Sequence, residues 1–262
     1  MSKNKLQKFS DLRAMSHVLQ PPFSDVLQQR PFALRGRWQI DFFHNDHPIV
    51  LELGCGKGEY TVEQAAADSN KNFIGIDVKG ARIWAGAVDS LRRQLTNVAF
   101  VRIDICNLPY IFAPSEVSEI WITFPDPQMQ KVRKRLTSTR FMQIYRRVLQ
   151  PDGRIHLKTD SRFLYTYTCA MAALNHLPVI EQTDDLYNSP WAECSPQCIR
   201  TYYEQQWLAR GITIKYLTLS LPCEGSLTEP NIDIPRDTYR TFGRDERSKV
   251  LDSIDRYKGD KA

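Results

Sequence analysis

One short stretch, residues 49–60, constrains the fold of this chain more than any other. Ile49 and Val50 are apolar and β-branched, which predicts a buried strand. An acid then precedes three glycines at alternate positions: Glu52, Gly54, Gly56 and Gly58. Glycine allows a tight turn and a close approach of the backbone to a ligand. A helical stretch follows, and a strand, glycine turn and helix in this order hold a nucleotide-like molecule in α/β proteins. The alternative is a glycine loop that only turns the chain.

Three further carboxylates follow predicted strands. Asp77 ends the stretch 73–77, and a carboxylate in that place can accept both hydroxyls of a ribose. Asp104 follows a strand predicted at 97–103, where a simple strand-end cap is the alternative. Asp126 lies between Pro125 and Pro127, which fix its backbone, and a plain turn is the alternative there. Ligands of doubly wound sheets bind beyond the carboxyl ends of the strands, so we expect these acids to share one edge.

Predicted strands and helices alternate along most of the chain. This order predicts an α/β protein: a Rossmann-like, doubly wound, mostly parallel sheet with helices on both faces. We expect a partly helical N-terminal arm over 1–30, the main domain over 31–221, and a C-terminal extension over 222–262 that is loosely packed or disordered. The strands are predicted at 49–53, 72–77, 97–103, 118–124, 154–158 and 212–221, and the helices at 60–68, 79–94, 140–149 and 163–177.

Composition excludes several classes of protein. The chain has 262 residues, 42% of them hydrophobic, and no apolar run long enough to predict a membrane span. Its first residues lack the apolar core of a secretory signal. Six cysteines form no C-x-x-C pair, and Cys194 and Cys198 have no histidine at zinc-site spacing, so we expect no metal. Unpaired cysteines fit a reducing cytoplasm.

Positive charge is concentrated between residues 127 and 162. This segment holds ten lysines and arginines against two aspartates, a net charge of +8 in a chain whose total is +5. Such a segment beside a ligand site predicts a polyanionic substrate. A solvated helix face is the alternative for Arg146 and Arg147, but it fits less well for 131–135, which follow a turn containing prolines.

Four motifs in order carry a specific resemblance. Glu52-x-Gly54-x-Gly56-x-Gly58, Phe124-Pro125-Asp126-Pro127, Lys158-Thr159-Asp160 and Thr201-x-x-Glu204 resemble the bacterial tRNA (guanine-N7-)-methyltransferase family, over roughly residues 23–220. The first motif alone is shared by class I S-adenosylmethionine-dependent methyltransferases in general. From the residues alone, Thr201 and Glu204 are a capping box that opens a helix, and we favour that interpretation for them.

The resemblance implies a class I methyltransferase fold, S-adenosyl-L-methionine as methyl donor, and tRNA as partner. It implies no metal and no membrane, a cytoplasmic monomer or homodimer, and Asp126 as the active-site residue. The substrate-contacting lysine of the family falls on Gln130 without a gap and on Lys131 with one, and we prefer Lys131 because it keeps the charge. The implied cofactor-binding residues are Glu52, Gly54, Gly56, Gly58, Asp77, Asp104 and Asp126, and the implied substrate-binding residues are Lys131, Asp160, Thr201 and Glu204.

The chemistry of guanine N7 fits this set of residues. Its lone pair lies in the ring plane and carries no proton, so no general base is needed, and none of the five histidines has an evident nucleophile partner. We expect Asp126, and secondly Asp160, to accept hydrogen bonds from the guanine, while Arg133, Lys134 and Arg135 bind phosphates. Two alternatives are a methyltransferase of the same fold acting on a small molecule or a protein, and a non-catalytic RNA-binding protein on a methyltransferase scaffold.

Overall fold

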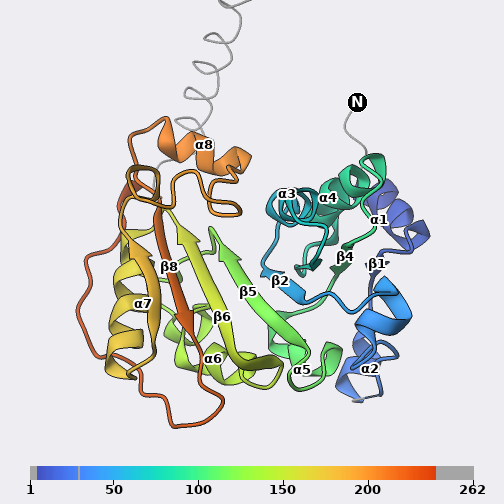
Figure 1. Cartoon of the computed structure of the whole chain (residues 1–262), viewed down its shortest axis with the longest axis horizontal. Helices are drawn as coiled ribbons and strands as arrows, with labels where there is room; N and C mark the ends of the chain where they lie inside the picture. The colour runs from blue at the N-terminus through green and yellow to red at the C-terminus, as the bar shows by residue number, and fades with distance from the viewer. Residues whose placement is uncertain (1–4, 29, 240–262) are drawn as a thin grey trace, which may run out of the picture.

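The computed structural model describes residues 5–28 and 30–239. They form an eight-stranded sheet in the order β1-β4-β3-β2-β5-β6-β8-β7 (Figure 1). The strands are β1 (Val18–Leu19), β2 (Ile49–Leu53), β3 (Asn72–Ile76), β4 (Val98–Val101), β5 (Val117–Thr123), β6 (Leu149–Thr159), β7 (Val179–Thr183) and β8 (Lys215–Ser220).

Helices connect most of these strands, as expected for a doubly wound fold. None of the helices in the described ranges is long and apolar enough to cross a membrane. The helices are α1 (Lys5–Ala14), α2 (Phe23–Leu27), the π-helix η1 (Trp38–Phe43), α3 (Glu59–Ala67), α4 (Gly80–Arg92), α5 (Leu108–Ile111), α6 (Thr139–Tyr145), α7 (Arg162–Leu174) and α8 (Tyr202–Leu208), with 3₁₀ turns η2 (Ile105–Asn107), η3 (Val132–Lys134) and η4 (Leu186–Asn188).

The sheet confirms the predicted class. β1, β4, β3, β2, β5 and β6 pair in parallel, whereas β8 is antiparallel to both β6 and β7. The strand order reverses between β2 and β5, and ligands of open α/β sheets bind at such a switch point. The arrows of β5 and β6 in Figure 1 point towards α8, so this helix lies at the carboxyl edge of the sheet.

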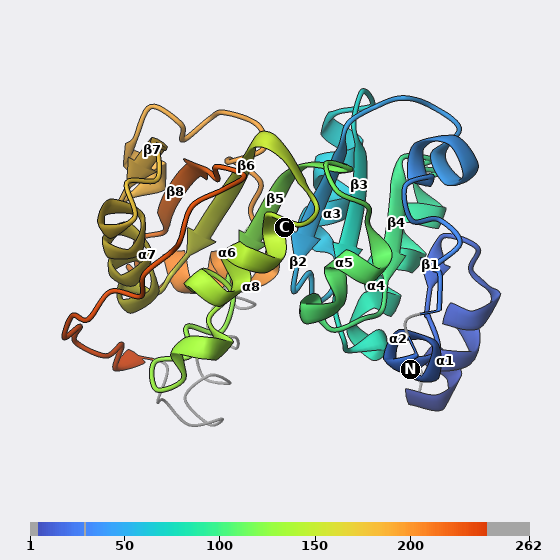
Figure 2. The ribbon, with the colours of Figure 1, turned by 90° about the horizontal axis from the view of Figure 1, so that it is seen from below.

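Successive side chains of a strand point to opposite faces of the sheet, so each strand contributes to two hydrophobic cores. On β2, Ile49, Leu51 and Leu53 face the core that contains α5, α6 and α7, while Val50 faces the core that contains α3 and α4. Figure 2 shows the sheet from β1 at one side to β7 at the other, with α5 and α6 in front of it. Because both faces are covered, β2 and β3 are buried along their whole length, which explains their apolar sequences.

The N-terminal arm extends the sheet. Helix α1 packs against α4, where the Trp84 indole donates to Asp11 over 2.8 Å. Val18 and Leu19 then add β1 in parallel to the edge strand β4. The helical part of the arm was expected from its spacing, but a two-residue strand is too short to give a periodic signal.

Two boundaries differ from the sequence expectation. The helix expected over 140–149 ends at Tyr145, and Leu149 already begins β6, five residues before the expected strand. Strand β7 was not expected at all. It is an edge strand with both faces partly exposed, so Val179 and Ile180 carry no alternating pattern.

The C-terminal extension is packed over residues 222–239, which we call the strap. The strap runs along α7 from its C-terminal end, where Asn175 binds the backbone of Thr228, to its N-terminal end, where Asp237 binds the backbone of Phe163 (Figure 1). Polar side chains thus attach the strap at both ends of α7, and Leu227 and Ile234 also pack against the hydrophobic core. The remainder of the expected extension, 240–262, lies outside the described residues.

The glycine turn depends on a close approach between α3 and α4. Gly58 precedes α3 with φ +71°, and a Cβ there would come within 2.7 Å of the Phe100 ring. A Cβ on Gly86 of α4 would lie 2.7 Å from the carbonyl oxygen of Lys57 and 2.9 Å from Cα of Gly58. Backbone atoms cannot move aside as a flexible side chain can, so α4 positions the turn.

We expect Gly86→Ala to lower the free energy of unfolding by about 1–3 kcal/mol, because its methyl group overpacks the turn. Urea denaturation measures the change. Ala85→Ser adds one atom at a half-buried position of the same helix and should change it by less than about 0.5 kcal/mol. Equal stabilities for the two variants would contradict the proposed contact.

Candidate active site

Two cavities open at the carboxyl edge beside the switch point. The glycine-turn cavity, about 160 Å³, is lined by the turn, by the end of β5 and by the start of α8. The arm cavity, about 540 Å³, lies between the N-terminal arm and the loops after β3 and β4. The glycine-turn cavity includes Glu52, Gly54, Gly56, Lys57, Thr123, Phe124, Thr201 and Tyr203, and the arm cavity includes Pro22, Phe23, Val78, Ile103, Asp104 and Asn107.

Asp77 lies between residues that line the two cavities, although it lines neither of them. Its carboxylate accepts from the backbone N–H of Gly56 over 3.0 Å and from that of Lys79 over 2.8 Å. Gly56 lines the glycine-turn cavity, and Val78, the neighbour of Asp77, lines the arm cavity. Each of its two oxygens therefore accepts from the backbone of one of the loops that carry the cavity residues.

Glu52 is buried beneath the glycine turn. One carboxylate oxygen accepts from the hydroxyl of Thr123 over 2.5 Å, and the other from the backbone N–H and hydroxyl of Thr61. Burial raises the pKa of Glu52 to about 7, although these hydrogen bonds act in the opposite direction. A cation bound in the adjoining cavity would favour the ionised carboxylate.

Asp104 caps a 3₁₀ turn. Its Oδ1 accepts from the backbone N–H of Cys106 over 2.8 Å at the start of η2, so the strand-end cap is confirmed. The residue is exposed and also lines the arm cavity, which leaves carboxylate surface available to a ligand. The two interpretations of Asp104 are therefore compatible.

Asp126 projects from a tightly held loop on the same edge. Phe124 and Gln128, on either side, both have φ +47°, and the Asp126 carboxylate accepts from the backbone N–H of Gln128 over 3.0 Å. The side chain is exposed, and Phe124 lines the glycine-turn cavity with Gly54. The proline-flanked acid therefore lies two residues after a residue of this cavity, beyond the carboxyl end of β5.

Arg135 holds this loop and is not free to bind phosphate. Its guanidinium donates to the carbonyl oxygens of Gln128 over 3.1 Å and Met129 over 3.0 Å, and it lies over the rings of Phe163 and Tyr167. The side chain is buried, which corrects the expectation that it contacts phosphates. Arg133 and Lys134, by contrast, are exposed.

A buried ion pair joins the third and fourth motifs. The Lys158 ammonium lies 2.8 Å from the Glu204 carboxylate, and both side chains are fully buried. Burial lowers the pKa of Lys158, while the negative charge of Glu204 opposes that change. Glu204 also completes the capping box with Thr201, which confirms the interpretation favoured from sequence. Its carboxylate thus faces protein groups rather than the cavity.

This ion pair places the start of α8 over the glycine-turn cavity. Thr201 and Tyr203 line the cavity, and the backbone N–H of Tyr202 donates to Glu59 of α3 over 2.7 Å. The Lys57 ammonium lies 5.1 Å and 5.5 Å from the ring centres of Tyr202 and Tyr203. Tyr203 belongs to the stretch 201–204 that the resemblance implied, whereas Lys57 was not predicted as a site residue.

Asp160 and Lys131 lie near a third cavity, about 450 Å³, between the Asp126 loop and the strap, which we call the strap cavity. Its lining residues are Asp126, Gln128, Met129, Gln130, Lys131, Arg236, Asp237 and Thr238. Both candidates for the substrate-contacting lysine position, Gln130 and Lys131, line it. Asp160 is buried next to it and accepts a 2.7 Å hydrogen bond from the Tyr239 hydroxyl.

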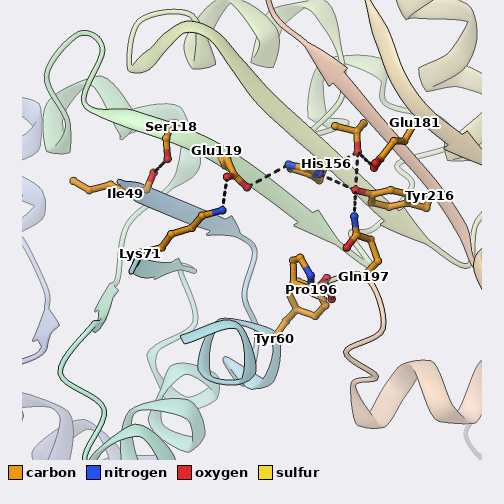
Figure 3. A network of polar contacts seen from close by, with 11 residues as sticks. Ile49, Tyr60, Lys71, Ser118, Glu119, His156, Glu181, Pro196, Gln197 and Tyr216 are labelled. Carbon is orange, nitrogen blue, oxygen red and sulfur yellow. Dashed lines mark hydrogen bonds and ion pairs between the residues drawn. The ribbon is translucent and has the colours of Figure 1, made fainter. Parts of the chain in front are cut away.

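A polar network supports the edge from beneath (Figure 3). The Lys71 ammonium binds Glu119 over 2.8 Å, Glu119 faces His156, and His156 Nδ1 lies 2.9 Å from the Tyr216 hydroxyl, which accepts from Gln197. Burial acts to raise the pKa of Glu119, but His156 and Lys71 outweigh it and lower that pKa to about 2. Burial lowers the pKa of His156, which favours the neutral ring. The network joins β5, β6 and β8 and does not open into the cavities above.

The described residues contain no group of three or more histidine, cysteine, aspartate or glutamate side chains that could hold a metal ion.

Comparisons with known proteins identify methyltransferases as relatives of this chain. A family model described as "Putative methyltransferase" matches residues 46–217. A Porphyromonas gingivalis protein named tRNA (guanine-N(7)-)-methyltransferase is 58% identical, over 92% of this chain and 100% of its own length. A protein of the same name from Bacteroides thetaiotaomicron is 54% identical, over 97% and 100%. A third, from Lactococcus lactis subsp. cremoris, is 32% identical, over 72% and 87%.

Two solved structures share the fold at low sequence identity. One, titled "Structure of an Antibiotic Related Methyltransferase", has a TM-score of 0.53 at 16% identity and covers 73% of this chain and 96% of its own. The other is a 16S rRNA (adenine(1408)-N(1))-methyltransferase from Catenulisporales acidiphilia, with a TM-score of 0.51 at 14% identity, covering 74% and 96%. The likeness concerns the sheet and its helices.

The raised pKa of Glu52 predicts a pH-dependent stability. Its pKa is about 7 in the folded protein and 4.5 in the unfolded chain, so the folded state loses stability as the pH rises from about 4.5 to about 7. Glu52→Gln keeps the shape and can still pair with Thr61 and Thr123. We therefore expect the stability of wild type relative to this variant to fall by up to about 3 kcal/mol over that interval.

Urea unfolding of both proteins at about pH 4.5 and about pH 8 measures this difference. Glu63→Gln, the same change on the exposed side of α3, is the control and should show little pH dependence relative to wild type. A constant difference between wild type and Glu52→Gln would show that Glu52 titrates normally.

Proposed function

This chain belongs to the tRNA (guanine-N(7)-)-methyltransferase family, and from that premise we propose how its own residues serve methyl transfer from S-adenosylmethionine to N7 of a guanine in tRNA. The observation that carries the proposal is the position of Asp126. This exposed acid lies two residues after Phe124, which lines the glycine-turn cavity, and it lines the strap cavity itself. We further propose a cytoplasmic monomer or homodimer, with a main domain over 31–221 that includes the matched residues 46–217.

The two cavities on either side of Asp77 would receive S-adenosylmethionine. Backbone groups of Gly54, Gly56 and Gly58 would receive its amino-acid end, and Asp77 would accept hydrogen bonds from the ribose hydroxyls. Asp104 in the arm cavity would accept from the adenine amine. Glu52 lies beneath the turn, where its negative charge favours a cationic ligand. When bound, the donor supplies a methyl group made electrophilic by its sulfonium.

Asp126 is the proposed catalytic residue. Guanine N7 needs no deprotonation, so the protein must align the base, exclude water and stabilise positive charge as it develops on the purine. The Asp126 carboxylate is held by the Gln128 N–H on one oxygen, which leaves the other to accept from guanine N–H groups. The rigid loop fixes this geometry before substrate binds.

The other residues predicted to bind the substrate fall into two groups, those that are accessible at a cavity and those that are buried. Lys131 is exposed beside Asp126 and would contact the RNA directly. Thr201 lines the glycine-turn cavity and can contact the base. Asp160 and Glu204 are buried, and we propose that they act by positioning: Glu204 through Thr201, and Asp160 through the strap cavity.

Exposed cations near the site support a polyanionic substrate. Arg133 and Lys134 lie on the 3₁₀ turn after the Asp126 loop, and Arg140 reaches the carbonyl oxygen of Arg133 over 3.1 Å. Other cations of the basic segment serve the fold, since Lys158 and Arg135 are buried and Arg146 binds backbone carbonyls of the strap. Of the exposed cations in this segment, Lys131 lines a cavity with Asp126, and Arg133 and Lys134 follow it in the chain. The RNA must also expose its guanine, since N7 lies in the deep groove of an RNA helix.

We expect Asp126→Asn to lower kcat by about 100-fold, because the neutral amide stabilises less of the charge that develops on the base. The Kd for S-adenosylmethionine should stay within about twofold of wild type, since the acid lies outside the glycine turn. Transfer of a labelled methyl group measures kcat, and calorimetry measures binding. A kcat close to wild type would refute the role of Asp126.

Asp152→Asn is the matched control, an exposed aspartate near the opposite edge of the sheet, and it should leave both quantities unchanged. Mass spectrometry of nucleosides from tRNA treated with wild-type protein tests the function itself. 7-Methylguanosine is expected. If methyl groups appeared only on small molecules or proteins, the RNA substrate would be wrong, and absence of donor binding would favour a non-catalytic scaffold.

Replacing Arg133 and Lys134 together by glutamine should raise the KM for tRNA and flatten its salt dependence, by about 0.9 in the slope of log Kd against log salt for each phosphate that the variant no longer neutralises. Arg154→Gln, an exposed arginine at the far edge of the sheet, is the control. Filter binding across a series of potassium chloride concentrations gives the slopes. If the double variant kept the wild-type slope, these two residues would be ordinary surface.

A further inference from the structure

We propose, resting on the function above, that the strap forms a wall of the substrate site and that Arg236 binds an RNA phosphate next to the target guanine. The strap lies beyond residues 46–217, the part of the chain that the family model matches. Its contribution therefore adds a subsite to the residues assigned so far.

Buried polar contacts attach the strap to the domain. The Glu229 carboxylate accepts from the backbone N–H of Thr139 over 2.9 Å, from the Thr139 hydroxyl over 2.6 Å and from the Tyr167 hydroxyl. Burial and this contact with Glu229 both raise the pKa of Tyr167, so its hydroxyl stays protonated and donates. Glu229 thus attaches the strap to the start of α6 and the middle of α7.

The end of the strap contacts the elements that carry the second, third and fourth motifs. Asp237 accepts from the Ser161 hydroxyl and from the backbone N–H of Phe163 over 3.1 Å, and thereby caps α7 directly after Asp160. The Asp237 N–H lies 3.3 Å from the sulfur of Met129, in the loop after Asp126. The ring of Tyr239 meets Trp207 of α8 edge-on at 5.4 Å.

These anchors turn Arg236 towards the Asp126 loop. Arg236 is exposed and lines the strap cavity opposite Lys131, so two cations border the same space. Of the two carboxylates there, Asp237 is buried and already bonded to the N-terminus of α7. The other, Asp126, is the proposed acceptor of hydrogen bonds from the guanine base. The strap cavity, about 450 Å³ in volume, therefore has two exposed cations at its rim, beside the catalytic acid.

A phosphate is the group that such a rim fits. The planar guanidinium of arginine pairs with two oxygens of a phosphate, and lysine adds a point charge. Because Asp126 lines the same cavity as Arg236 and Lys131, a phosphate bound there would lie close to a guanine held by Asp126. Contacts to phosphates fix the register of a nucleic acid without reading its sequence. A residue that positions the target guanine needs only this property.

The test compares Arg236→Gln with wild type in the full-length protein. We expect the KM for tRNA at about 150 mM salt to rise about tenfold, and the slope of log Kd against log salt to fall by about 0.9. We expect kcat at saturating tRNA and the Kd for S-adenosylmethionine to stay within about twofold, because Arg236 touches neither the donor site nor the anchors of the strap. Arg236→Lys should recover part of the affinity.

Arg154→Gln is the control for the loss of one exposed charge. If Arg236→Gln matched this control in KM and in salt slope, the inference would be wrong. If wild type formed no 7-methylguanosine, the proposed function would fail instead, and the salt slope for tRNA binding without donor would still decide the role of Arg236. Thermal melting of each variant checks that the strap stays folded.

Discussion

The buried ion pair between Lys158 and Glu204 is the interaction on which the site depends. Lys158 lies at the carboxyl end of β6, and Glu204 lies in α8, so their 2.8 Å contact fixes the cover of the cavity to the sheet. The Lys158 ammonium also donates to the carbonyl oxygens of Gln197 and Ile199, at 2.9 Å and 2.6 Å. Removal of one partner from such a pair costs about 3–5 kcal/mol, because the other charge stays buried. This pair, together with the Tyr202 N–H bond to Glu59, holds the start of α8 over the glycine turn.

A second layer of polar and aromatic contacts makes that edge rigid. The rings of Trp121 and His156 stack in parallel at 4.0 Å on adjacent strands, and Tyr60 of α3 donates to the carbonyl oxygen of Pro196 over 2.7 Å. Figure 3 shows Tyr60 beside Pro196, and Tyr216 of β8 bonded to Gln197, in the segment before α8. A methyl transfer that depends on alignment alone needs such a support, since a small displacement of the reacting groups slows it strongly.

The acids of the site therefore act in two different ways. Glu52 and Glu204 are buried and hold backbone and side chains in place, whereas Asp104 and Asp126 keep exposed carboxylate surface. Asp160 lies between these groups, buried but beside the strap cavity. The basic segment divides similarly, because Arg135 and Lys158 belong to the fold while Lys131, Arg133 and Lys134 face solvent. The net charge of the segment therefore overestimates its exposed positive charge, because it includes arginine and lysine side chains that are buried.

The sequence by itself determined the sheet, the glycine turn and the edge on which Asp77, Asp104 and Asp126 lie, because strand periodicity and glycine spacing are local properties. It also determined the capping box at Thr201. It did not reveal β7, an edge strand without alternation, nor the packing of the strap, whose polar anchors Glu229 and Asp237 find partners some 60 to 90 residues away. Only the tertiary structure decided which charges are exposed and which are buried, because burial depends on what the rest of the chain places against each side chain.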